Sequence, residues 1–201
     1  MIRRSLLVLT VLALALPTAA RAHDVPGVAP ETATIQAEFN ASLLDAETKI
    51  MDLAEATPEG KYGWAPAKGV RSMSEVFMHV ASANYFLPTF FGVAAPTGVD
   101  ASKLEAEVKD KATAIKTLKA SFAAAHAAID ATTDHETKIK MFGMDMTKRY
   151  AMMVLVTHAH EHLGQAIAYA RSNGITPPWT ARQEAAEAEA KAKQGKTGKT
   201  K

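Results

Sequence analysis

The chain has 201 residues, a formal net charge of +2 at pH 7 and no cysteine. Without cysteine there is no thiolate metal ligand and no cysteine nucleophile, so transition-metal chemistry has to use imidazole and carboxylate groups. The sequence has no basic stripe interleaved with aromatic residues, which argues against a nucleic-acid-binding protein. Its length suits a single domain with one hydrophobic core.

Residues 1–22 have the pattern of an export signal. They combine a basic start at Arg3 and Arg4, an apolar stretch of about a dozen residues and a small-residue cleavage site that ends at Ala22. A membrane span needs about 20 apolar residues, so no stable membrane anchor is expected. Cleavage near Ala22 removes three arginines, which lowers the formal charge from +2 to −1. The sequence therefore predicts a periplasmic or secreted protein that begins at His23.

Two amphipathic segments follow in the predicted mature chain. Apolar residues recur at helical spacing over residues 31–56, and Pro58 follows as a helix terminator. A second helix is predicted to begin after Ser72, because Ser72 and Glu75 form a capping-box pattern. This helix is expected to run to about Phe86.

The second half of the chain predicts two longer helices. Asp100 is a candidate N-cap for a third helix that runs to about Ala131. Residues 132–145 break the helical pattern and fit either a short hairpin or an irregular loop. A fourth helix is predicted from near Thr147 to Asn173, where the glycine that follows suits a left-handed C-terminal cap.

Four amphipathic helices without a competing strand pattern predict an all-α fold, a four-helix bundle over residues 23–180. In residues 181–201, glutamate and lysine first alternate with alanine and then give way to a polar, glycine-containing end. We expect a short solvated helix there that passes into a charged, disordered C-terminal tail.

Two histidines one helical turn apart are the strongest chemical signal in the sequence. His158 and His162 are at positions i and i+4, so both imidazoles lie on one helix face, as two ligands of one metal ion would. Metal sites in bundles take ligands from facing helices, which makes His79 and His126 the candidates for a third ligand. His160 points to the opposite side. Hydrogen-bonded packing of the histidines in the core is the alternative.

The chain resembles the DinB-like (damage-inducible) metal-binding four-helix bundles over nearly all of its predicted mature length. The resemblance lies in residues 62–66, 70–75, 79, 84–85, 158–165, 169–171 and 174–179. It implies that His79, His158 and His162 bind one divalent transition metal ion, with zinc or nickel favoured and iron also compatible with imidazole ligands. It further implies a homodimer.

The resemblance implies two kinds of function. In a metal-dependent hydrolase or thiol transferase, the metal activates water or a thiol for reaction with a small-molecule substrate, and Gln165 or Glu161 orients it or carries a proton. The alternative is a non-catalytic exported protein that binds or sequesters the metal. Export argues against the thiol transferase, because low-molecular-weight thiols occur mainly in the reducing cytoplasm.

Two further groups of residues leave alternatives open. Aromatic residues gather in residues 85–91, where they either line a substrate pocket near the metal or pack the end of the bundle. Five methionines between positions 141 and 153 would suit copper(I), but methionine is also a common filler of helical cores.

Overall fold

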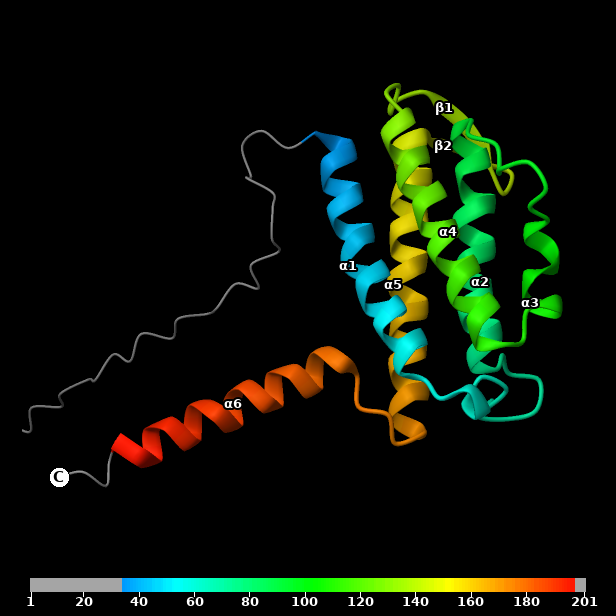
Figure 1. The fold of residues 1–201 in the computed structure, drawn as a ribbon. Coiled ribbons are helices and arrows are strands. Elements are labelled where there is room, and N and C mark those ends of the chain that lie inside the picture. Colours follow the sequence, from blue (N-terminus) through cyan, green and yellow to red (C-terminus); the bar gives the residue numbers. More distant parts are fainter. Residues whose placement is uncertain (1–33, 198–201) are drawn as a thin grey trace, which may run out of the picture.

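The structure is a computed structural model that describes residues 34–197, so the predicted signal peptide and His23 lie outside the described residues. Within that range, four long helices pack side by side (Figure 1). They are α1 (Ile35–Ala56), α2 (Met73–Phe86), α4 (Lys111–Ala131) and α5 (Lys148–Ser172). Both α1 and α2 pack against α4 and α5, which confirms the predicted all-α four-helix bundle.

Apolar side chains from all four helices fill the centre of the bundle. Leu43, Phe77, Phe122 and Leu155, one from each helix, are fully buried. Buried residues at three- and four-residue spacing form one stripe on α1, α4 and α5, whereas α2 is buried over most of its surface, and burial of this apolar surface drives the helices together. As a result α2 packs against α5, which brings residues of these two helices together although they are far apart in sequence.

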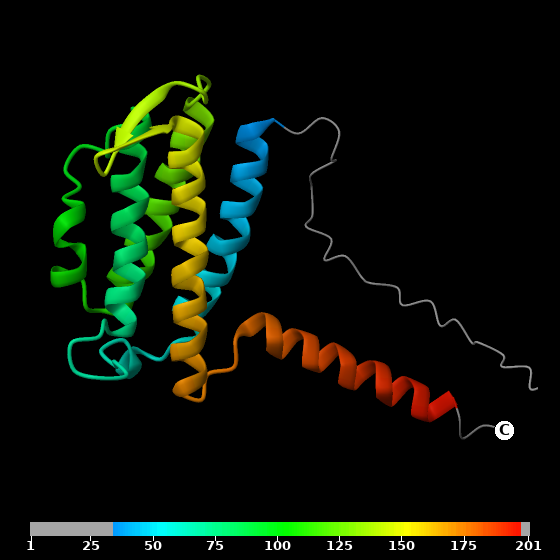
Figure 2. The same cartoon turned by 180° about the vertical axis from the view of Figure 1, so that it is seen from behind.

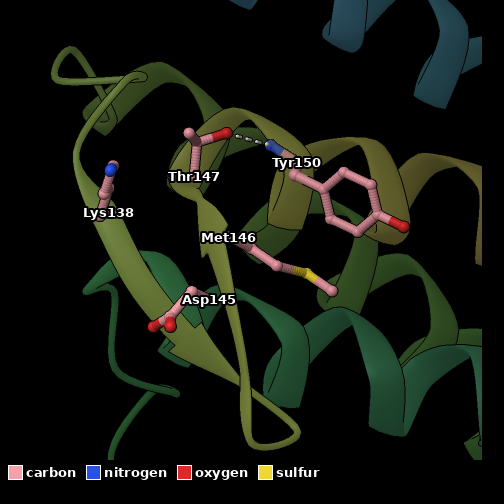
Figure 3. A pocket seen from close by; sticks show the side chains of 5 residues that line it. All are labelled: Lys138, Asp145, Met146, Thr147 and Tyr150. Carbon is pink, nitrogen blue, oxygen red and sulfur yellow. Dashed lines mark hydrogen bonds between the residues drawn. The ribbon is translucent and has the colours of Figure 1, made fainter.

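Side-chain caps mark where all four bundle helices begin, as α2 and α5 illustrate. Ser72 Oγ accepts a hydrogen bond from the Glu75 amide, and the Glu75 carboxylate accepts one from the Ser72 amide, so the predicted capping box is present. Thr147 Oγ1 caps α5 by accepting a hydrogen bond from the Tyr150 amide (Figure 3). These bonds satisfy amides that no helix carbonyl reaches.

The predicted third helix is wrong in its first part. Asp100 caps a 3-10 turn, η3 (Ala101–Lys103), instead of a long helix. This turn continues into the one-turn helix α3 (Leu104–Glu107), and α4 begins only at Lys111. As a result, α3 lies alongside α2 on the side away from α1, as Figures 1 and 2 show.

The interruption between α3 and α4 has a local physical cause. Val108 is extended, with φ −93° and ψ 107°, and its carbonyl oxygen accepts a hydrogen bond from Ser74 Oγ on α2. Asp110 then accepts a hydrogen bond from the Thr113 amide and starts α4. A second capping aspartate and an anchor on α2 therefore interrupt the expected helix at residues 108–110.

Residues 132–145 and the two after them contain an antiparallel hairpin, which decides between the two predicted alternatives. Its strands are β1 (Lys138–Met141) and β2 (Met144–Thr147). The two turn residues, Phe142 and Gly143, both have positive φ, 50° and 81°. Such a turn matches the twist of a tight hairpin, and glycine adopts it at little cost.

Beyond the bundle, α6 (Pro178–Thr197) projects away from α5 (Figures 1 and 2). It is longer than the short helix expected before a disordered tail, while residues 198–201 lie outside the described residues. Alanine, glutamate and lysine are strong helix formers, and Glu189 and Lys193 form an i,i+4 ion pair at 2.6 Å. No helix in the described part of the chain has the length and apolar character needed to cross a membrane.

Two 3-10 turns complete the described elements. The first, η1 (Glu59–Lys61), follows α1 in the connection to α2. The second, η2 (Leu87–Phe91), directly continues α2 and ends at Gly92, whose φ is 95°. Tyr85 and Phe91 are buried whereas Phe86 is exposed, so the aromatic segment 85–91 is partly core.

Candidate metal centre

Three histidines from two helices converge where α2 packs against α5. His79 lies on α2, and His158 and His162 lie one turn apart on α5. Each imidazole offers one nitrogen, and these three nitrogens all lie within 4.8 Å of one another. In the described part of the chain, this triad is the one group of three histidine or carboxylate side chains that converges in this way. The structure thus brings together the three residues that the resemblance implies.

The spacing of the triad nitrogens fits a single metal ion. His79 Nε2 and His158 Nε2 are 3.2 Å apart. Two nitrogens bound tetrahedrally to zinc at about 2.0–2.1 Å lie about 3.3 Å from each other. His79 and His158 therefore need little movement to become ligands of one ion.

The triad is electrostatically suited to a cation because two of its imidazoles, those of His158 and His162, favour the neutral form. Burial, together with repulsion from the neighbouring His162 and His79, lowers the pKa of His158 to about 4. Burial also lowers the pKa of His162, although the hydrogen bond with Gln165 opposes the shift. Neutral imidazole is the form that binds a metal, so protons compete weakly at these positions near pH 7.

Hydrogen bonds orient two of the three rings. His79 Nδ1 lies 2.6 Å from Glu105 Oε1, and His162 Nδ1 lies 2.8 Å from Gln165 Oε1. Since carboxylate and amide oxygens accept, each Nδ1 carries the proton and each Nε2 has its lone pair free for a metal. Gln165 is itself fixed, because its Nε2 donates to the Tyr169 hydroxyl at 3.0 Å.

Glu105 is the site residue that the sequence analysis missed. It lies on α3, 26 residues after His79, in a segment expected to belong to one long helix. Burial would raise the pKa of Glu105, but hydrogen bonds from Arg71 and His79 outweigh burial and hold the pKa below its usual range. Arg71 Nε donates to Glu105 Oε2 at 2.6 Å, which places a permanent cation beside the triad.

Gln165 and Glu161, the two residues predicted to assist the metal, have different surroundings. Gln165 contacts the triad directly through its hydrogen bond with His162. Glu161 is exposed, and its negative charge raises the pKa of His162 through space. Only the first of the two is therefore a hydrogen-bond partner of a triad imidazole.

The remaining described histidines lie apart from the triad. His126, the other candidate for a third ligand, is within 2.7 Å of Asn40 Oδ1 and 2.9 Å of Glu47 Oε2, between α4 and α1. His160 Nδ1 bonds to a backbone carbonyl of its own helix at 3.0 Å. His135 lies ahead of the hairpin, with its Nε2 buried. These contacts show that His126 is a packing residue between two helices.

Two pockets adjoin the triad and share Glu105. The first, the polar pocket, is lined by Gly69, Val70, Arg71, Glu75, Glu105 and Gln165. The second, which we call the α2 groove, is lined by His79, Ser82, Ala83, Phe86, Ala101, Ser102 and Glu105. A small molecule can thus approach the triad both along charged groups and along the surface of α2.

A further pocket lies where the hairpin joins α5, and its lining includes none of the triad residues. Its lining consists of Lys138, Asp145, Met146, Thr147 and Tyr150, which Figure 3 shows between the two strands and the start of α5. This lining carries no histidine. We therefore place the candidate chemistry at the triad.

Replacing Glu105 by glutamine is expected to weaken metal binding about 10- to 100-fold, the usual effect of losing a carboxylate behind a histidine ligand. The amide is less basic than the carboxylate, so His79 Nε2 becomes a poorer donor. Competition with a chromophoric chelator measures the change. Glu107→Gln, on the same short helix and exposed, is the matched control. Equal affinities of the two variants would contradict this role of Glu105.

Comparison with known proteins places the chain in a family. Its sequence matches the family model of the DinB superfamily over residues 42–166. A DinB-like protein from Bacillus cereus is 18% identical with a TM-score of 0.61, and the match covers 70% of this chain and 93% of that one. A DinB-like protein from Bacillus subtilis, YjoA, is 20% identical with a TM-score of 0.56, covering 69% of this chain and 93% of that one.

A third solved structure is YfiT from Bacillus subtilis, described as a probable metal-dependent hydrolase with an unusual four-helix bundle topology. It is 14% identical with a TM-score of 0.56, and the match covers 75% of this chain and 95% of that one. No curated protein matches the chain. The solved structures share the fold, and the family model spans more than half of the sequence. The protein is therefore a member of the DinB superfamily.

Proposed function

We propose that the protein is an exported metal-dependent hydrolase that acts on a small molecule, with one divalent ion held by His79, His158 and His162. The triad carries this proposal, because three imidazole nitrogens converge from two packed helices. Three protein ligands leave the fourth position of a tetrahedral site open, as in catalytic zinc sites and unlike structural ones. The description of the fold relative YfiT supports the same function.

Zinc or nickel suits three neutral imidazoles best, and iron is the third choice. When bound, such an ion supplies Lewis acidity and makes water acidic enough to act as a nucleophile near neutral pH. The chain's own groups hold the geometry, since Glu105 fixes the ring of His79 and Gln165 fixes that of His162.

The polar pocket supplies the groups that would meet a substrate. Arg71 lines it and keeps a positive charge beside the triad, which favours negative charge that develops on a substrate oxygen. Glu161, exposed on α5 and electrostatically coupled to His162, is our candidate for exchanging a proton with solvent. Gln165 can orient a group by hydrogen bonding but carries no titratable proton.

Export is part of the proposal and rests on the signal-like residues 1–22. It favours hydrolysis over thiol transfer, since water is available in every compartment and low-molecular-weight thiols are not. The non-catalytic alternative, an exported protein that sequesters the metal, uses the same triad. Turnover separates the two functions.

Hydrolysis of chromogenic esters by the zinc-loaded mature protein is the test of this function. We expect activity that is lost with a chelator, restored by zinc, and at least about 100-fold lower in His158→Ala. His160→Ala, two residues away on the same helix, is the matched control and is expected to retain activity. One equivalent of bound zinc without zinc-dependent turnover across an ester and amide panel would favour the sequestering protein instead.

A further inference from the structure

The α2 groove begins at the triad and follows one face of α2. His79, Ser82, Ala83 and Phe86 line it, at positions i, i+3, i+4 and i+7 of the helix. The opposite wall comes from η3 and α3, the segment that Figure 1 shows alongside α2. One end of the groove is therefore a candidate metal ligand, and the other end is an aromatic ring.

The polar side chains of the groove already have partners. Ser82 Oγ donates to the Ala101 carbonyl at 2.7 Å, and Ser102 Oγ donates to Asp100 Oδ1 at 2.6 Å. Glu105 is engaged by two hydrogen bonds from neighbouring side chains. What the groove offers to an occupant is mainly methyl groups and an aromatic face, so the occupant that fits is apolar.

Three aromatic rings meet at the far end of the groove. The ring centroids of Phe86 and Phe90 are 5.2 Å apart, and those of Phe90 and Phe142 are 4.9 Å apart. Phe86 is 49% exposed and Phe142 is 62% exposed. Single exposed apolar residues are common in proteins, but a contacting cluster at the end of a pocket marks a surface that binds an apolar group.

We propose that the α2 groove binds the apolar chain of the substrate, so that the hydrolysed molecule is an ester of an unbranched fatty acyl group. From His79 to Phe86 the helix rises about 10 Å, the length of roughly six to eight carbons. The pocket volume of about 250 Å³ suits such a chain. In the reaction, the acyl carbon takes the hydroxyl of water, the acyl C–O bond breaks, and the leaving oxygen takes the proton.

This inference rests on the proposed hydrolase, because it names the substrate class of the same site. A series of p-nitrophenyl esters from acetate to octanoate, given to the zinc-loaded mature protein, is the first arm of the test. Each methylene buried fully in an apolar groove is worth about fourfold, so even partial burial of the six added methylenes is expected to raise kcat/KM at least about 30-fold from acetate to octanoate. A flat or falling series in an active protein would overturn the inference while the hydrolase stands.

Phe86→Ala is expected to lower the octanoate-to-acetate ratio of kcat/KM about 10-fold. Leu44→Ala, which shortens a comparably exposed apolar residue on α1, is the matched control and keeps the wild-type ratio. Ala101→Trp fills the groove from its other wall and should remove the preference for long chains even if Phe86→Ala folds poorly. Zinc content is measured in each variant, and wild-type ratios in both groove variants would overturn the inference.

The second arm does not depend on turnover. Isothermal titration calorimetry of the zinc-loaded protein should detect octanoate at one site, at least about 10-fold tighter than butyrate and weakened by Phe86→Ala. If octanoate binds in this way but no ester is hydrolysed, the groove stands as an acyl-chain site and the hydrolase proposal fails. If octanoate and butyrate bind alike, the groove is not an acyl-chain site.

Discussion

Alanine at any one of His79, His158 and His162 should abolish stoichiometric metal binding. The three nitrogens lie within 4.8 Å of one another, so each imidazole supplies one of three ligands to a shared ion. Removing a residue that merely supports a ligand already costs about 10- to 100-fold in affinity, and loss of the ligand itself must cost more. We expect an affinity loss greater than about 100-fold in each variant.

Elemental analysis of the mature protein, purified without chelator or affinity tag, measures this effect directly. Wild type should carry about one equivalent of zinc, nickel or iron per chain, and the three variants close to none. His160→Ala is the matched control, because His160 lies on α5 between two triad residues and bonds to a backbone carbonyl. A full equivalent retained by any triad variant would remove that histidine from the site.

Two adjacent leucines on α1 should differ sharply in their effect on stability. Leu43 is fully buried between helices, whereas Leu44 is 55% exposed. Leu43→Ala removes buried methyl groups and leaves a cavity, which lowers the free energy of unfolding by about 2–5 kcal/mol. Leu44→Ala changes the same atoms on the surface and should alter the free energy by no more than about 0.5 kcal/mol.

Urea unfolding of the metal-free protein, followed by far-UV circular dichroism, measures both leucine variants without a contribution from bound metal. The comparison tests the orientation of α1 in the bundle, because a rotation of the helix by one residue would exchange the two positions. Equal destabilisation by both substitutions would contradict the packing described here.

Much of the fold could be predicted from local signals. Ser72 and Glu75 form the capping box that their spacing predicts, and Thr147 caps α5. Apolar periodicity predicts the bundle because α1, α4 and α5 each bury one stripe, which is a property of local sequence. The sequence does not decide between a hairpin and a loop at residues 138–147, since a tight turn with Phe142 at positive φ has no strong sequence signature.

The missed break between α3 and α4 shows where local reasoning stops. Asp100 and Asp110 are both good N-caps, and the sequence does not say which one starts the long helix. The choice depends on Ser74, which binds the Val108 carbonyl across 34 residues. The periodicity of apolar residues carries no information about such tertiary contacts, so the position of α3 could not be predicted.

The candidate site likewise contains residues that the sequence predicts and one that it does not. The spacing of His158 and His162 was readable from the sequence, and the family resemblance added His79. Glu105 could not be found from the sequence, because its contact with His79 depends on the interruption of the helix at Val108. Export, the homodimer and the identity of the metal remain predictions.

Anomalous X-ray diffraction at the zinc absorption edge, from crystals of the zinc-loaded mature protein, locates the bound ion. We expect one anomalous peak per chain, about 2.0–2.1 Å from one nitrogen each of His79, His158 and His162, with a fourth position not filled by protein. A peak at other side chains, or no peak in crystals soaked with excess zinc, would show that the triad is not the metal site and leave the histidines as packing residues of the bundle.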